Sequence, residues 1–350
     1  MLVVITFIVL LSLGTVVHGI VYRVQAVSGK GLGVVAARDI HVGECIMSDM
    51  PLLSLPTDKG SLTADDRKRV LRLVEDEVNR LPLLGQKRFR ALSGYVPPVF
   101  DDADNDADDG GTDRAPSALE VFRTNALPMG KGRVGIFPDI ARLNSHCRPN
   151  LHYSWDDDAA QATVYAVAPV QAGQELCISY MGPCYPRRDR RGYLSTNFGF
   201  TCRCTVCALT GDDAMESDHR RATLAGLEAA AQQAIAARDA DAAVAVAAER
   251  LRLFENEGLG SPANRYFCEL DAFYALAGVA RHVNADTVCE AVASGARDEV
   301  ARGRYVQAGE WAARAHRSAT LCKGGRSSAA TRCLAYASAV ESGLATAPQA

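Results

Sequence analysis

Four cysteines have the spacing of a metal site. Cys202, Cys204 and Cys207 form a C-x-C-x-x-C cluster, and three thiolates packed so tightly favour a metal ion. Structural zinc sites are closed by four ligands, so one more ligand is needed. Cys147, in the stretch NSHCRPN at 144–150, is the natural candidate. We expect these four thiolates to bind one Zn2+, which would bring the two stretches together.

Two further stretches carry residue types that bind or position a small ligand. Residues 28–40 read SGKGLGVVAARDI, and without a Cβ at Gly31 and Gly33 the backbone can approach a ligand and adopt a positive φ. Residues 175–180 read ELCISY, so Tyr180 falls between the two cysteine-bearing stretches and would be held near their junction. Taken singly, a glycine-rich hairpin indicates only a turn, and a tyrosine that ends a strand is a core residue.

In this order along the chain, the stretches at 28–40, 144–150, 175–180 and 202–207 resemble the SET domain of lysine methyltransferases. They are most similar to the SMYD-type branch, in which the cysteine of an N-H-S-C-x-P-N stretch completes a post-SET zinc site. The resemblance implies an S-adenosylmethionine-dependent protein-lysine N-methyltransferase that also holds Zn2+. Its partner would be a protein or peptide that presents a lysine, with histones among the expected substrates.

The resemblance also implies how the cofactor is held. The glycine turn would lie against its methionine end, Asn144 would hold its amino-acid end, and Phe200 would stack on the adenine, which is worth roughly 1–3 kcal/mol by analogy with base stacking. The usual Asn-His-Ser-Cys order is changed to Asn-Ser-His-Cys at 144–147, so serine replaces histidine, and His146 is expected as a packed or exposed ring. The residues implied at the cofactor are Lys30, Gly31, Leu32, Gly33, Asn125, Asn144, Ser145 and Phe200.

Methyl transfer from a sulfonium to an amine is an in-line displacement, so the enzyme must align the reactants and deliver a neutral amine. Free lysine has a pKa near 10.4, so it must lose a proton and its water shell, which a narrow apolar channel promotes. The resemblance implies that Tyr180 lies beside the sulfonium methyl and orients the amine. Phe198 matches a channel residue that is often tyrosine, and the missing hydroxyl would leave room for a second or third methyl group. The alternative is that both Phe198 and Phe200 are core residues.

The elements that must position these residues are short strands followed by helices. Helices are predicted over 61–89 and 118–125, with an acidic surface loop at 101–113 between them. Apolar runs bounded by Gly and Asp predict short strands within 22–56 and at 152–155, 162–167 and 176–180.

The last third of the chain is rich in alanine and predicts a helical domain. Two helical faces are predicted there, Val244, Ala247, Leu251 and Phe254 on one and Phe267, Leu270, Tyr274 and Ala277 on the other. This region resembles the tetratricopeptide-like C-terminal domain of SMYD-type proteins, although a generic helical brace explains it equally well.

The predicted fold class is therefore α+β, with a SET domain of short β-sheets, a post-SET zinc site and an α-helical C-terminal domain. The predicted boundaries are 1–20 for a hydrophobic segment, 21–182 for the SET domain with a helical, acidic insertion at 57–120, 183–210 for the post-SET region and 211–350 for the helical domain.

Composition limits the partners and the compartment. The net charge is −3 with no basic stripe, so direct nucleic-acid binding is not expected. The odd number of cysteines, 11, fits a reducing compartment, the nucleus or the cytoplasm. Residues 1–20 carry no Lys, Arg, Asp or Glu, which also fits a signal peptide for the secretory pathway, a short membrane anchor or a wrongly assigned start. Membrane association is expected only if this segment is an anchor.

Two other functions remain open. A catalytically inactive SET scaffold could act as a zinc-stapled interaction module, which the altered order at 144–147 favours. The absence of any Cys or His between 51 and 130 also favours it, because the MYND zinc finger of SMYD-type proteins would lie there. A secreted, disulfide-stabilised protein is supported by the apolar segment at 1–20 alone.

Overall fold

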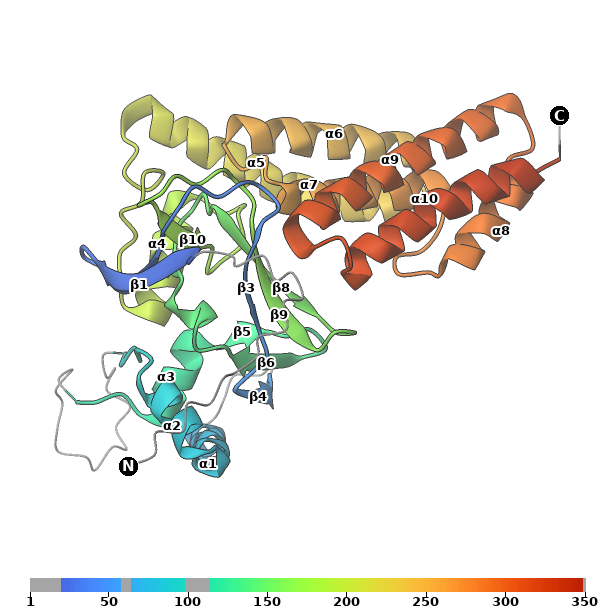
Figure 1. Cartoon of the computed structure of the whole chain (residues 1–350). Coiled ribbons are helices and arrows are strands. Elements are labelled where there is room, and N and C mark those ends of the chain that lie inside the picture. The colour runs from blue at the N-terminus through green and yellow to red at the C-terminus, as the bar shows by residue number, and fades with distance from the viewer. Residues whose placement is uncertain (1–19, 58–63, 98–113, 349–350) are drawn as a thin grey trace, which may run out of the picture.

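A computed structural model of the 350-residue chain describes residues 20–57, 64–97 and 114–348. Nearly all of the apolar segment at 1–20 and the whole acidic run at 101–113 lie outside the described residues, so the predictions made for them stay predictions. The described chain has a β-rich N-terminal part and an elongated helical C-terminal part beside it (Figure 1). This arrangement confirms the predicted α+β class.

The N-terminal part is built from short strands. They form three sheets within the described residues, with the orders β1-β2-β10-β7, β3-β9-β8 and β4-β6-β5. The bounds are β1 (Tyr22–Val27), β2 (Gly31–Ala36), β3 (Cys45–Asp49), β4 (Leu53–Pro56), β5 (Leu127–Pro128), β6 (Arg133–Ile136), β7 (Asn144–Ser145), β8 (Leu151–Asp156), β9 (Gln161–Ala166) and β10 (Glu175–Ile178).

The first sheet brings together three of the stretches that the sequence singles out. β1 and β2 form an antiparallel hairpin, and β10 pairs with the other edge of β2. β10 also runs parallel to β7, which places Cys177 opposite Asn144 and Ile178 opposite Ser145. The glycine turn and the stretch at 144–150 are therefore neighbours in space although more than a hundred residues separate them.

The strand predicted to end at Tyr180 ends at Ile178 instead. The backbone N–H of Tyr180 donates to the side-chain Oγ of Ser145 at 3.3 Å and does not extend the ladder. Tyr180 therefore lies two residues beyond β10, in the loop that leads to the next helix, at Arg187–Phe198.

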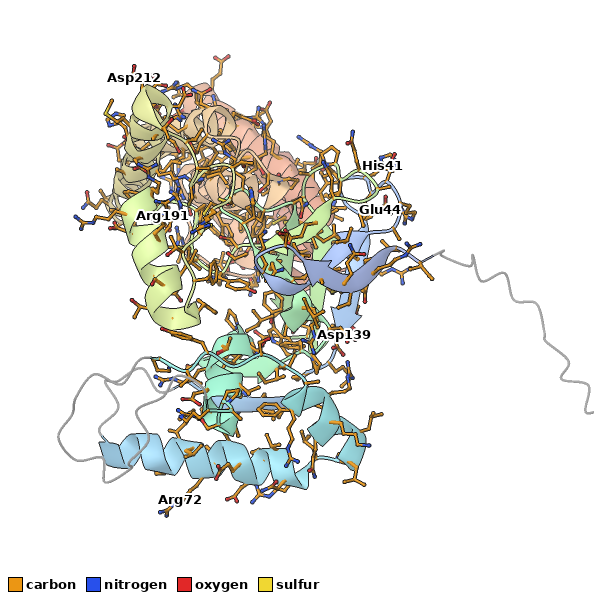
Figure 2. The ribbon with its side chains drawn as sticks, turned by 90° about the vertical axis from the view of Figure 1, so that its left-hand side faces the viewer. His41, Glu44, Arg72, Asp139, Arg191 and Asp212 are labelled. Atoms are coloured by element: carbon orange, nitrogen blue, oxygen red, sulfur yellow. The ribbon has the colours of Figure 1, made fainter. Side chains whose placement is uncertain are left out.

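The single helix predicted over 61–89 is two helices, α1 (Ala64–Arg80) and α2 (Leu83–Arg90). Pro82 separates them in an extended conformation, with φ −55° and ψ 153°, because proline has no N–H to donate and its ring clashes with the preceding turn. The helix predicted over 118–125 is confirmed as α3 (Ala118–Asn125), which begins at a capping box between Ser117 and Glu120. Figure 2 shows Arg72 on α1 at one end of the molecule and Asp212 on α5 at the other.

The rest of the chain is helical. After α4 (Arg187–Phe198), the C-terminal part consists of α5 (Gly211–Ala236), α6 (Ala240–Asn256), α7 (Pro262–Ala277), α8 (Ala285–Gly295), α9 (Glu299–Lys323) and α10 (Ser328–Thr346). Side-chain caps at Asp239, Asn284, Asp298 and Ser327 start four of these helices. In the part of the chain that the structure covers, no helix is both long and apolar enough to cross a membrane.

Helix α7 lies at the centre of the helical part, and most of its residues are buried. Leu270, Tyr274 and Ala277 are buried as the helical pattern predicts, but Phe267 on the same predicted face is 52% exposed. The C-terminal end of α9 meets the β-rich part, where the Lys323 Nζ donates to the Oγ of Ser154 at 3.0 Å. The two parts are therefore packed directly against each other.

Candidate functional site

The four predicted zinc ligands converge. The Sγ atoms of Cys147, Cys202, Cys204 and Cys207 all lie within 4.8 Å of one another. Cys147 Sγ is 3.9 Å from that of Cys202 and 3.5 Å from that of Cys207. Four sulfurs around one tetrahedral Zn2+, each with a Zn–S bond of about 2.3 Å, would be separated by about 3.8 Å. The donor set and its spacing therefore fit a structural zinc ion.

Electrostatics supports the same assignment. Hydrogen bonding to Cys202 and to the other two cysteines raises the pKa of the Cys147 thiol, while the contact with Cys147 lowers the pKa of the Cys204 thiol. Without a cation, one sulfur keeps a proton so that its neighbour can ionise. A divalent cation would stabilise all four thiolates together.

Two arginines of helix α4 donate hydrogen bonds to the cysteine cluster. Arg190 is 1% exposed, and its Nη2 donates to the Sγ of Cys207 at 3.6 Å. Arg191, labelled in Figure 2, donates from Nη2 to the backbone oxygen of Cys207 at 2.8 Å. Such contacts orient ligands and offset the negative charge of a thiolate cluster.

A second cluster lies at the edge of the first sheet. The Nδ2 of Asn144 donates to Glu175 Oε1 at 2.9 Å and to the backbone oxygen of Leu32 at 3.3 Å. The Nζ of Lys30 binds the other oxygen of Glu175 at 2.5 Å. A Cβ added to Gly33 would lie 2.6 Å from Asn144 Nδ2, so only glycine fits against this amide. The cluster therefore joins the glycine turn, Asn144 and Glu175, and Glu175 is a member that the sequence analysis did not single out.

The surroundings of this cluster suit a bound cofactor. Gly31 has a φ of +72°, with no atom within 4 Å of a Cβ placed there, so open space lies above the turn. Leu32, in the turn, is 51% exposed, and Phe200, whose ring lies 6.5 Å from that of Phe198, is 37% exposed. Polar groups from Asn144, an open turn and exposed apolar side chains are the parts that a nucleoside-like ligand with a charged amino-acid end requires.

The side chains of two predicted cofactor residues make hydrogen bonds within the protein. The amide of Asn125 donates to the backbone oxygens of Ser93 at 2.6 Å and Val121 at 2.7 Å, so both contacts serve α3 and its neighbour. Ser145 is buried, and its Oγ accepts the N–H of Tyr180. The ring of His146 contacts the Arg148 backbone and Thr205, outside the four-sulfur cluster.

The predicted catalytic residues are in ring contact, with their planes tilted by 39°. The ring centroids of Tyr180 and Phe198 are 4.8 Å apart, and Phe198 lies 6.5 Å from Phe200. The Tyr180 hydroxyl donates to the backbone oxygen of Leu143 at 2.8 Å. Burial raises the pKa of this hydroxyl, so it stays protonated at neutral pH. Its oxygen lone pairs remain available to accept a hydrogen bond.

Tyr180 and Phe198 line a cavity of about 570 Å3 between the β-rich part and α7. The β-rich side contributes Leu143, Ile178 and Tyr153, and the helical side contributes Leu259, Ala263 and Phe267. None of the described residues that line it is Asp or Glu. The exposure of Phe267 is thus explained, because its ring faces this cavity and not the helical core.

Of the predicted cofactor residues, Asn125 lines this cavity, on the side of Tyr180, while Asn144 and Gly33 lie in the separate cluster. The sequence analysis missed Tyr193, whose ring is 6.1 Å from Phe198, and also His152 and Phe267 in the cavity wall. Tyr193 lies five residues before Phe198 on α4, which is not the spacing of one helical face, so periodicity gave no signal for Tyr193. Nothing local in the sequence marks the other two.

Comparisons with known proteins agree with this geometry. Residues 31–181 match the model of the SET domain. The chain is 28% identical over 206 residues to histone-lysine N-methyltransferase set5 of Schizosaccharomyces pombe, which covers 59% of this chain and 56% of that protein. It is 34% identical over 86 residues to N-lysine methyltransferase SMYD2 of Homo sapiens, covering 25% of this chain and 19% of the relative.

The chain thus spans little more than half the length of the first relative and about a fifth of the second. These comparisons lend no support to a signal peptide in the segment at 1–20. The matched region contains the glycine turn, Asn144, Cys147 and Tyr180. Residues 31–181 of the chain are therefore similar to a SET domain.

Proposed function

We propose that this protein is an S-adenosylmethionine-dependent protein-lysine N-methyltransferase. One observation carries the proposal: two consecutive residues of β7 reach the two halves of the site. The side chain of Asn144 belongs to the cluster with the glycine turn and Glu175, and the side chain of Ser145 accepts the N–H of Tyr180. The ligand cluster and the aromatic cavity therefore adjoin each other through this strand.

In this proposal the cluster of Lys30, Gly31, Gly33, Asn144 and Glu175 would hold the amino-acid end of S-adenosylmethionine, and Phe200 would pack on its adenine. The bound cofactor supplies an electrophilic methyl group on a sulfonium. The carboxylate of Glu175 suits an ammonium group, and the Asn144 amide and backbone groups of the turn suit a carboxylate. These donors and acceptors match the two charges of an amino acid.

The cavity receives the lysine. Its mainly apolar lining, which includes Arg123 but no carboxylate among the described residues, favours the neutral amine, because removal from water and a nearby cation both disfavour the ammonium form. The amine loses its proton to solvent as it enters. The Tyr180 hydroxyl donates its hydrogen to the backbone oxygen of Leu143, so its oxygen can accept a hydrogen bond from an N–H of the amine. This hydrogen bond would turn the nitrogen lone pair toward the methyl group. Tyr180 thus orients the nucleophile and does not act as a base.

The four thiolates bind one structural Zn2+ in this proposal. The ion would tie Cys147, next to β7, to the segment directly after Phe198 and Phe200. Both aromatic residues would then be held against Tyr180. Three of the ligands lie within six residues of one another, so the metal would fix this segment together with the arginine contacts from α4.

The first experiment is a thermal-shift and calorimetric titration of the reduced protein with S-adenosylhomocysteine. We expect binding in the micromolar range and a rise in melting temperature. Methyl transfer is then measured by mass spectrometry on histones, since the relative from Schizosaccharomyces pombe is named a histone-lysine methyltransferase, and on a mixed protein extract. A folded, zinc-loaded protein that binds neither S-adenosylmethionine nor its product would refute the proposal and favour the inactive scaffold.

The nucleus or the cytoplasm is the compartment that this proposal favours, since zinc-bound thiolates persist where thiols stay reduced. Fractionation of cells that express the full chain tests it. Recovery in the secretory pathway would contradict it.

A further inference from the structure

The most unusual polar feature outside the site is a fully buried glutamate at the end of α6. Glu257 is 0% exposed. Its Oε1 accepts from Ser217 Oγ at 2.6 Å and from Arg221 Nε at 2.9 Å, and its Oε2 accepts from Arg220 Nε at 2.9 Å. Arg148 Nη2 reaches Oε1 at 3.4 Å. One carboxylate therefore gathers three arginines from two distant parts of the chain.

The hydrogen bonds of Glu257 and its arginines connect the two walls of the cavity. Arg221 is 0% exposed and donates from Nη1 to the backbone oxygen of Pro183 at 2.6 Å, and from Nη2 to that of Cys147 at 3.0 Å. Pro183 and Cys147 both line the cavity from the SET side. Glu257 itself precedes Leu259 and Ser261, which line the opposite side. The Glu257–Arg221 pair is thus a direct link between the two walls.

The loop after Glu257 lies close to Arg148, and its backbone conformation favours glycine. Gly258 has a φ of +66°, and a Cβ added to it would lie 3.1 Å from Arg148 Nε. The loop therefore passes close to the residue that follows the zinc ligand Cys147. Burial by itself raises the pKa of Glu257, but Ser217 and the arginines outweigh it and hold this pKa below its usual value. The glutamate is therefore ionised at neutral pH, and its charge attracts all three arginines.

We propose that Glu257 is a positioning residue that sets the width of the substrate cavity by fixing α7 and its preceding loop against the SET domain. It touches neither reactant. The helical part then forms one wall of the cavity, and the Glu257 carboxylate holds this wall at a fixed distance from the opposite wall. The functional part of this inference rests on the proposed methyltransferase activity, and its geometric part does not.

The chain offers a matched control. Asp271 on α7 is also buried, at 6% exposure, and also joins two arginines, Arg250 at 3.0 Å and Arg281. This second carboxylate lies within the helical part and does not line the cavity. Glu257→Gln and Asp271→Asn both neutralise a buried carboxylate between arginines, so both should lower the melting temperature. Only Glu257→Gln should alter the cavity.

The experiment compares the full-length wild type and the two variants by hydrogen exchange and by kinetics, well below their melting temperatures. In Glu257→Gln, exchange at residues 145–149, 181–184 and 258–263 should accelerate on the order of tenfold. The KM for the protein substrate should rise about tenfold, while the Kd for S-adenosylhomocysteine should stay within a factor of two. Asp271→Asn should leave all three measurements as in the wild type. If Glu257→Gln does not fold, Arg148→Ala removes one partner and should show the same pattern more weakly.

Unchanged exchange at the three segments in Glu257→Gln overturns the proposal, and so does an equal rise of KM in Asp271→Asn. A wild type that transfers no methyl group contradicts the proposed function, and hydrogen exchange still decides whether Glu257 positions the walls.

Discussion

Replacing Tyr180 with phenylalanine tests the proposed chemistry most directly. The change keeps the ring and its 4.8 Å contact with Phe198, and it deletes the hydroxyl that donates to the Leu143 oxygen at 2.8 Å. If the amine is oriented by this hydroxyl, turnover should fall by about tenfold or more, a barrier increase of about 1.4 kcal/mol. The cofactor cluster lies on the other side of β7, so affinity for S-adenosylhomocysteine should hardly change.

The same substitution also has a cost in stability that must be separated from catalysis. Leu143 is buried, and an acceptor that loses its donor costs about 1–3 kcal/mol. This corresponds to a melting temperature lower by several degrees, because about 1 kcal/mol shifts a domain of this size by roughly 2–4 °C. Turnover is therefore measured well below the melting temperature of the variant, by mass spectrometry of a methylated peptide.

Tyr185→Phe is the matched control. Tyr185 is 50% exposed and does not line the cavity, so loss of its hydroxyl should change neither turnover nor stability. Undiminished turnover in Tyr180→Phe, with the expected loss of stability, would show that Tyr180 is a core residue only. The reasoning about the amine would then be refuted, although the methyltransferase proposal would survive.

Four other predictions follow from the same geometry. Cys204→Ser should release zinc, as measured by elemental analysis, and lower the melting temperature markedly, since structural zinc supplies on the order of 10–16 kcal/mol at neutral pH; retention of one zinc per chain would contradict the four-thiolate site. Asn144→Ala should weaken calorimetric binding of S-adenosylhomocysteine by at least about tenfold, or 1.4 kcal/mol, and leave zinc in place; unchanged binding would remove Asn144 from the cofactor site. Phe198→Tyr should restrict the number of methyl groups added without stopping the first transfer, and an unchanged product distribution in the mass spectrum would make Phe198 a core residue. Burial, with Lys323 nearby, lowers the pKa of His152 to about 3, so below about pH 6.5 the unfolded chain binds a proton there that the folded chain does not. The free energy of unfolding of the wild type should therefore fall relative to that of His152→Gln by up to about 1.4 kcal/mol per pH unit between pH 6.5 and 3. Denaturation curves that give the same pH dependence for both proteins would contradict this.

The parts of the site that depend on short stretches of sequence were predictable. Three zinc ligands lie within six residues, and the glycine turn needs only its own backbone freedom. Cys147 was the candidate for the missing fourth ligand, and the resemblance supplied roles for Asn144 and Tyr180. The structure places Cys147 with the other cysteines, Asn144 beside the glycine turn and Tyr180 in the cavity wall. Pro82 could have been read as a helix boundary, because the physical reason for it is local.

Residues whose role depends on distant partners were not predictable. The amide nitrogen of Asn125 donates to backbone oxygens of Ser93 and Val121, a contact that its residue type did not indicate, and its place at the cofactor stays a prediction. Phe267 has the helical spacing of a core residue, yet it is 52% exposed, because the end of α7 leaves the helical core and faces the cavity. Hydrophobic periodicity predicts which face of a helix is apolar, but not what lies opposite that face.

The sequence by itself indicated the β-rich and helical parts, the three neighbouring thiolates and the glycine turn, because these features depend on residue type and short spacing. Tertiary structure alone decided that β7 joins the two halves of the site, that α7 closes the cavity, and that Glu257 links both walls. The role of the Glu257 carboxylate depends on its contacts with Arg148 and Arg221, which lie 109 and 36 residues away in the sequence. A buried charge is stable only with its partners in place, and only the folded chain brings those partners together.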